Sequence, residues 1–397
     1  MKIVIALDSF KGSCSAQLAC QAVAEGFKRV TTDLDVTLLP ISDGGEGLLD
    51  SLEHSFILSG VIPHTFSCTG PYGSLVDARL LVLDGKTAFI EMAQCCGLEL
   101  VKSEHRQVEK ASTYGLGEMV LHALNLGCTR IIMGIGGSAT NDGGVGFAQA
   151  LGAQFYGRDQ QVMTHPICGE DLINIKEISI EELDSRLDSV EFSVSCDVEN
   201  PLLGDNGATY IYGPQKGADK ATLDKLEAGM THFAALMFKT TGKDFSLEAG
   251  SGAAGGLGAG LKWFVSARLE KGIDLVLDLL GAESYIQQAD LVIVGEGRLD
   301  SQSANGKAPV GVARMANHYG VPTIALCGGY SDDSRLLYQH GITAMWSLCP
   351  GPITLEQAMT NGARYLSDTA ENLLRTVLSG KALSSKVLLD TNKIVKH

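Results

Sequence analysis

The chain has 397 residues, more than one hydrophobic core usually serves, so we expect two domains. Its content of 45% hydrophobic and 19% charged residues is typical of a well-packed globular protein and argues against global disorder. The net charge of −15 argues against a nucleic-acid partner, because phosphates require a basic surface.

The cysteines and the apolar segments indicate a cytoplasmic protein. None of the ten cysteines forms a C-x-x-C pair, and Cys95 and Cys96 are adjacent, so we expect buried thiols in a reducing compartment. No segment approaches the roughly 20 apolar residues that a membrane helix needs. The first apolar run reaches Asp8 too soon for a signal peptide.

The N-terminal segment predicts a strand followed by a helix. Lys2–Asp8 is a short β-branched run, and Ser15 is a suitable N-cap for a helix over Ala16–Val30. The helical period indicates a buried face formed by Leu18, Ala22, Val23 and Phe27.

The same alternation of strand, loop and helix recurs along the chain and predicts parallel sheets. A hairpin is also expected, across the turn Asp84-Gly85. The fold class is therefore α/β, with a doubly wound Rossmann- or flavodoxin-like domain from residues 1–70 and 285–397 and an inserted mixed α/β domain from residues 71–284. Further strands are expected at Val36–Pro40, Arg130–Ile135, Asp290–Val294, Val321–Leu326 and Ile342–Leu348.

Loops at strand ends carry most of the conspicuous polar residues, and ligands of parallel sheets bind at such ends. In DSFKG, Asp8 can hold a metal or take a proton, and Lys11 can bind an anion. In DGGEG, the carboxylates Asp43 and Glu46 suit a hard metal such as Mg²⁺. A helix cap is the structural alternative for both loops.

Two glycine-rich loops indicate binding of an anion or a nucleotide. GIGGSATNDGG, residues 134–144, formally satisfies the dinucleotide fingerprint G-x-G-x-x-A, but its mid-chain position and Asp142 favour phosphate and metal handling. GSGAAGGLGAG, residues 250–260, either cradles a phosphate or permits close helix packing. A Walker A motif is absent from the sequence.

The segment GEGRLD with the following GK is the sharpest motif. Arg298 and Lys307 are suited to grip a carboxylate or phosphate, while Asp300 is suited to serve as a base or metal ligand. A salt-bridge network is the structural alternative. CDVENP likewise places Asp197 after a strand, and GPQKG places Lys216 on a turn.

These carboxylates and glycine loops, without a nucleophile elbow or a histidine metal motif, favour phosphoryl transfer, which depends on positioning and charge stabilisation. Two alternatives remain open: an NAD(P)-dependent oxidoreductase acting on a hydroxy acid, and a non-catalytic metabolite sensor.

Seven motifs in order, DSFKGS, SDGGEG, GIGGSATNDGG, CDVENPL, GPQKGA, SGAAGGLGAGL and GEGRLDSQSANGKAPVGVA, resemble the bacterial glycerate kinase family. The resemblance implies ATP-dependent phosphorylation of D-glycerate in organic-acid catabolism, with 2-phosphoglycerate the favoured product. It also implies two domains with the active site in the cleft between them. A homo-oligomer is left open.

Carried over to this sequence, the resemblance implies ATP and Mg²⁺ as cofactors and four sets of site residues. The expected catalytic carboxylates are Asp8, Asp197 and Asp300. The expected substrate-binding residues are Lys11, Arg298 and Lys307. The expected nucleotide-binding residues are Gly134, Gly136, Gly137, Ser138, Gly255 and Gly256. The expected metal ligands are Asp43, Glu46 and Asp142.

Overall fold

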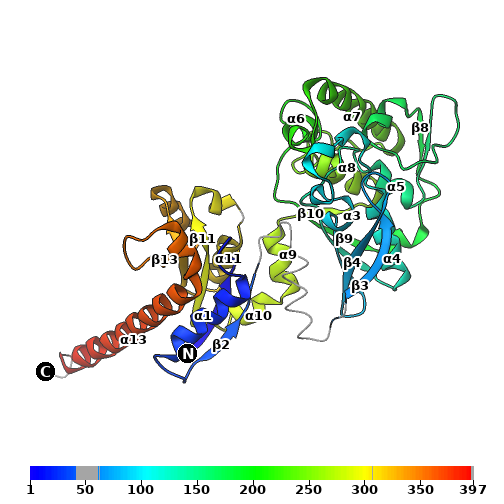
Figure 1. Ribbon diagram of the computed structural model, residues 1–397. Coiled ribbons are helices and arrows are strands. Elements are labelled where there is room, and N and C mark those ends of the chain that lie inside the picture. Colours follow the sequence, from blue (N-terminus) through cyan, green and yellow to red (C-terminus); the bar gives the residue numbers. More distant parts are fainter. Residues whose placement is uncertain (42–60, 62, 306, 395–397) are drawn as a thin grey trace. The chain divides into compact units, whose positions relative to one another are not determined.

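The computed structural model describes residues 1–41, 61, 63–305 and 307–394 (Figure 1). The chain divides into two compact units, which are described separately. The terminal unit comprises Met1–Asp43 and Val276–His397, and the central unit comprises Gly44–Leu275. No helix in these described ranges is long and apolar enough to cross a membrane.

The terminal unit is built on a parallel sheet with the strand order β13-β12-β11-β1-β2. Counted within the unit, this order is 2-1-3-4-5 from the opposite edge, which is the flavodoxin-like arrangement. It confirms the predicted doubly wound fold class. The strands are β1 Lys2–Leu7, β2 Asp35–Leu38, β11 Leu291–Leu299, β12 Thr323–Tyr330 and β13 Ile342–Ser347.

Helices cover both faces of this sheet. Ile3, Ile5 and Leu7 of β1 cluster with α1 and α13, which pack against each other, while α11 packs on β1, β11 and β12 (Figure 1). The helices of the unit are α1 Ala16–Lys28, α10 Ala282–Ile286, α11 Ala308–His318, α12 Leu355–Thr360 and α13 Gly362–Ile394, and α9 Gly272–Leu279 spans the boundary.

Helix α1 begins as the sequence predicts, because the Ser15 hydroxyl accepts a hydrogen bond from the Leu18 N–H at 3.3 Å. The predicted buried face needs one correction, since Leu18 is 45% exposed. The buried face centres instead on Ala19, Val23 and Phe27. Leu18 precedes Ala19 by one residue, so its side chain is rotated by about 100° around the helix axis, away from that face.

The central unit contains a mixed sheet with the strand order β10-β9-β6-β5-β4-β3. Strands β5, β6, β9 and β10 run parallel, whereas β3, β4 and β5 pair antiparallel. The predicted hairpin is confirmed, with Leu83 opposite Thr87. The strands are β3 Pro63–Thr69, β4 Leu75–Leu83, β5 Thr87–Glu91, β6 Arg130–Gly134, β7 Gln154–Tyr156, β8 Glu177–Ser179, β9 Glu191–Ser195 and β10 Arg268–Glu270.

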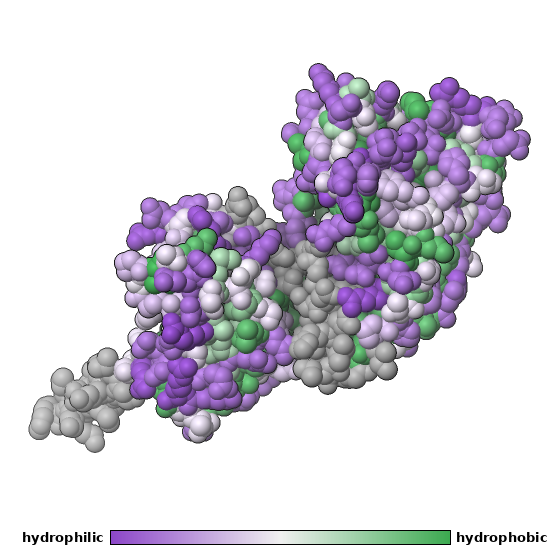
Figure 2. Space-filling view, viewed as in Figure 1, coloured by the Kyte–Doolittle hydropathy of each residue, from purple (hydrophilic) through white to green (hydrophobic). Residues whose placement is uncertain are grey.

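Because β3 pairs with β4 along its length, the central unit begins earlier than the boundary expected near residue 70. Its helices pack around a core of buried aliphatic and aromatic side chains, including Phe147, Phe155 and Phe233. Figure 2 shows hydrophilic side chains over most of the described surface in view, with smaller hydrophobic patches on each unit. The helices are α3 Ala93–Cys96, α4 Tyr114–Asn125, α5 Val145–Ala150, α6 Ala208–Tyr212, α7 Lys220–Thr241 and α8 Ala253–Val265.

Candidate functional site

A pocket of about 680 Å³ lies in the terminal unit, at the carboxyl ends of β1, β11, β12 and β13. This edge of the sheet includes the point between β1 and β11 where the strand order reverses, which is where open α/β sheets bind ligands. Four of the predicted site residues line it, namely Lys11, Arg298, Asp300 and Lys307. The first motif and the GEGRLD motif therefore contribute to one pocket, although almost 290 residues separate them.

The pairing of β1 with β11 brings these two motifs together. Leu7 is in register with Gly295, and the Asp8 N–H donates a hydrogen bond of 3.0 Å to the Gly295 carbonyl. Asp8 is therefore fixed at the end of β1, directly beside the start of the GEGRLD segment.

Glu296 anchors one side of the pocket. Its carboxylate, 12% exposed, accepts hydrogen bonds from the Ser303 hydroxyl at 2.7 Å and the Lys307 ammonium at 3.4 Å. Burial raises the pKa of Glu296, against the opposing effect of Ser303 and Lys307. Glu296 belongs to the GEGRLD motif, and its contact with the ammonium shows that it positions Lys307.

Arg298 and Asp300 lie more openly in the same pocket. The Arg298 Nε and the nearer Asp300 carboxylate oxygen are 4.0 Å apart, and the Arg298 side chain is 74% exposed. Such a loose, exposed pair contributes little to stability. The guanidinium can therefore reorient toward an anionic ligand at small cost.

The charge of the pocket is opposite to that of the whole chain. Three cationic side chains, Lys11, Arg298 and Lys307, face two carboxylates, Glu296 and Asp300, in a protein whose net charge is −15. A local excess of cations on an acidic protein favours binding of an anion at this position.

The remaining predicted residues that the structure describes lie in the central unit, apart from Asp8. Asp197 follows β9, and its carboxylate accepts a hydrogen bond of 3.0 Å from the Gly272 N–H. Asp43 and Glu46 lie outside the described residues. Within the described ranges, no group of three or more His, Cys, Asp or Glu side chains forms a metal cluster.

Asp142 occupies the interior of the mid-chain glycine loop. Its carboxylate is fully buried and accepts hydrogen bonds from the Thr113 N–H and hydroxyl, at 2.8 and 2.7 Å, and from the N–H groups of Gly144 and Gly146. Burial raises the pKa of Asp142, and these hydrogen bonds oppose the rise. In this structure the Asp142 oxygens are engaged in holding the loop, and the role of Asp142 as a metal ligand stays a prediction.

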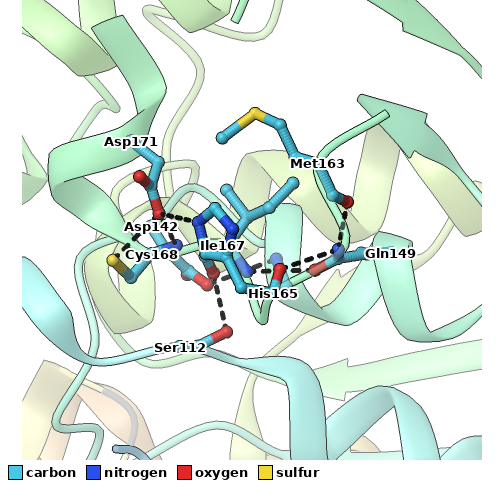
Figure 3. A network of polar contacts seen from close by, with 9 residues as sticks. Ser112, Asp142, Gln149, Met163, His165, Ile167, Cys168 and Asp171 are labelled. Atoms are coloured by element: carbon cyan, nitrogen blue, oxygen red, sulfur yellow. Dashed lines mark hydrogen bonds and ion pairs between the residues drawn. The ribbon is translucent and has the colours of Figure 1, made fainter. Parts of the chain in front are cut away.

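The segment behind this loop is held by a second polar network (Figure 3). The Gln149 side chain donates to the carbonyls of Met163 and His165, both at 2.9 Å, and accepts from the Ile167 N–H at 3.0 Å. Ser112 donates to the Ile167 carbonyl at 2.7 Å. Polar groups here serve the internal architecture of the unit.

Lys216, which the sequence places on a turn, lies under the same loop. It is 3% exposed, and its ammonium donates to the Ser138 hydroxyl at 2.7 Å and to the Thr140 carbonyl at 2.8 Å. Burial lowers the pKa of Lys216 to about 7, although Asp142 opposes that change. A lysine in the motif GPQKG gives no sequence signal of burial, so this role was missed.

Glycines of the two central loops provide close backbone packing. A Cβ at Gly255, whose φ is +70°, would lie 2.0 Å from the Thr140 carbonyl oxygen, and one at Gly256 would lie 3.0 Å from Gly143 Cα. Of the two expectations for residues 250–260, a phosphate cradle and close helix packing, these contacts therefore support close packing. Of the nucleotide-binding set, Gly136 is exposed and Gly137 is half-buried, whereas Gly134, Ser138, Gly255 and Gly256 are buried.

Replacing Gly255 with alanine should destabilise the central unit by about 3 kcal/mol or more, because a left-handed φ and a backbone clash act together. Gly242→Ala is the matched control: its φ is also +70° but a Cβ there meets nothing within 4 Å, so we expect a loss of only about 1 kcal/mol. Urea unfolding of both variants measures the difference. Equal losses would show that the contact with Thr140 carries no cost.

Lys216→Met should change how stability depends on pH. Between pH 7 and about 10 the unfolded chain binds the Lys216 proton and the folded chain does not, so wild-type stability should rise with pH relative to the variant, by at most about 1.4 kcal/mol per unit. Urea unfolding in a Trp346→Phe background lets Trp263, the other of the two tryptophans, report the central unit. A pH-independent difference would contradict the prediction.

Comparisons with known proteins give consistent matches over nearly the whole chain. The model of the glycerate kinase family matches residues 3–378. A glycerate kinase from Bacillus subtilis is 45% identical over 387 residues, covering 96% of this chain and 99% of that protein. A glycerate 2-kinase from Escherichia coli is 43% identical, with the same coverage of both chains.

A solved structure shows the same similarity at the level of the fold. The crystal structure of a glycerate kinase 2 from Salmonella typhimurium LT2 is 40% identical and gives a TM-score of 0.85, covering 96% of this chain and 99% of that one. The chain belongs to the glycerate kinase family, phosphotransferases that act on an alcohol group.

Proposed function

We propose that the chain transfers the γ-phosphoryl group of ATP to the C2 hydroxyl of D-glycerate, giving 2-phosphoglycerate and ADP. The observation that carries this proposal is the convergence of Lys11, Arg298 and Lys307 with Asp300 in one pocket at a sheet edge. The E. coli relative named glycerate 2-kinase favours the C2 position. The matches to kinases leave the oxidoreductase and the sensor without support.

Both reactants are anions, and the transferred group carries its charge through the transition state. Catalysis of this transfer is mainly positioning and charge stabilisation, which three converging cations supply. Arg298 offers a planar fork for a phosphate or carboxylate, and Lys11 and Lys307 offer point charges.

A carboxylate must take the proton of the attacking hydroxyl. The candidates are Asp8, Asp197 and Asp300, and among them Asp300 lines the pocket beside Arg298. The hydroxyl oxygen forms the new bond to phosphorus as the bond to the β-phosphate oxygen of ATP breaks. ADP leaves with the electron pair.

Magnesium fits the carboxylates at this sheet edge. In kinases Mg²⁺ is held by one or two carboxylates together with phosphate oxygens and water, so a cage of three protein ligands is not required. Asp8 would hold it, because Asp300 is the candidate base and both Glu296 oxygens are engaged by Ser303 and Lys307. Bound Mg²⁺ would neutralise the phosphate charge.

The ten cysteines are free thiols, and seven of them are buried. Unpaired thiols support the proposed cytoplasmic location, because a reducing compartment preserves them.

Phosphorus NMR of the product from D-glycerate and MgATP should show a proton-coupled doublet, because a phosphate on C2 couples to one proton. A triplet would identify the 3-phosphate instead. Reactions without glycerate control for ATP hydrolysis. The proposal would be overturned if no phosphoglycerate formed and a nicotinamide cofactor were reduced in the presence of glycerate.

Replacing Asp300 with asparagine should lower kcat by roughly 100-fold or more with the fold retained, because accepting the proton of the hydroxyl requires the carboxylate. Asp332→Asn is the matched control, since Asp332 is an exposed carboxylate beside the same segment. ADP release under saturating glycerate measures both. Similar rates for the two variants would remove Asp300 from the reaction.

A further inference from the structure

The pocket in the terminal unit has two chemically different halves. Its cations come from the β1 and β11 side, whereas its apolar wall comes from the segments that follow β13. The wall consists of Leu348, Leu355, Ala358, Met359 and Tyr365, together with Phe10. Glycerate carries a carboxylate and two hydroxyls on three carbons, so this acid provides little apolar surface for such a wall.

Between the two halves lies a strip without side chains. Gly328 and Gly329 of β12 line the pocket, and a Cβ at Gly329 would meet nothing within 4 Å. A strip of backbone beside apolar side chains is a surface on which a flat aromatic ring can lie. Leu355 supports the same interpretation, because it is a large apolar side chain that is 76% exposed at the pocket rim.

The size of the pocket also discriminates between the two reactants. At roughly 20 Å³ per non-hydrogen atom, a three-carbon hydroxy acid would fill about a fifth of 680 Å³, and a nucleoside triphosphate would fill most of it. Both ends of such a nucleotide find a matching surface, the base on the apolar wall and the phosphates on the cations.

We propose that this pocket binds the purine nucleotide, with the base against Leu355, Met359 and the Gly328-Gly329 strip and the phosphates toward Lys11, Arg298 and Lys307. The inference rests on the proposed kinase function and names the reactant that this site takes. It differs from the expectation that the mid-chain loop holds the nucleotide phosphates. In that loop Ser138 already accepts a hydrogen bond from Lys216, and Gly255 packs against Thr140.

Replacing Leu355 with asparagine tests the apolar half without adding charge. Leu247→Asn is the matched control, because Leu247 is 82% exposed in the central unit and outside this pocket. Calorimetric titration of each full-length variant with MgADP and with inorganic tripolyphosphate separates recognition of the base from recognition of phosphate. No glycerate is added to these titrations, and the KM for glycerate is measured separately from ADP release at saturating MgATP.

For Leu355→Asn we expect the Kd for MgADP to rise roughly 5- to 20-fold, while the Kd for tripolyphosphate and the KM for glycerate stay within about twofold. The control variant should match the wild type in all three. A raised KM for glycerate with unchanged MgADP affinity would overturn the inference and assign the pocket to the hydroxy acid. Unchanged values throughout would also overturn it.

The result is independent of turnover. If wild-type protein binds MgADP through Leu355 but forms no phosphoglycerate, the pocket assignment stands and the proposed reaction fails. If phosphoglycerate forms while the Leu355 variant binds MgADP normally, the reaction stands and the pocket assignment fails.

Discussion

The pairing of β1 with β11 is the constraint on which the described pocket depends. Ile3 to Leu7 align with Leu291 to Gly295, so the beginning of the chain becomes the neighbour of a strand near its last quarter. Parallel strands end at the same edge of a sheet, and both strands are buried, so a shift in register would disrupt the packing of their apolar side chains against the helices on each face. Lys11 and Arg298 are brought to one pocket because that register is fixed.

Glycine serves opposite purposes in the two units. In the central unit Gly255 and Gly256 let one backbone approach another, so their effect is internal. In the terminal unit Gly329 faces open space, so its missing side chain leaves room at the surface of the pocket. A glycine-rich sequence is compatible with either purpose, and only the neighbouring atoms distinguish them.

This ambiguity explains how far the sequence could predict the molecule. Alternation of apolar strands and helices was sufficient for the sheet of the terminal unit, the helix cap at Ser15 and the hairpin at Asp84-Gly85, because each depends on local pattern and turn chemistry. The buried Lys216, the fully bonded Asp142 and the exposed Leu18 were not predictable, because each depends on partners distant in sequence or on exact helical phase. The apolar wall was missed for the same reason, since Leu348, Leu355 and Met359 follow the last strand and belong to no motif.

The cations of this protein divide by burial into two physical roles. Lys216 is enclosed beneath the mid-chain loop, where burial lowers its pKa to about 7. It acts through two short hydrogen bonds, to Ser138 and Thr140. Arg298 keeps its hydration and its freedom because most of its side chain faces water. Burial of a charge is costly unless the charge is paired. A cation that binds an anionic ligand only during part of the reaction cycle is therefore less costly when it is exposed to water in the absence of that ligand. Lys307 is intermediate in burial between Lys216 and Arg298. Its pairing with Glu296 holds it in place while about a third of its side chain stays exposed.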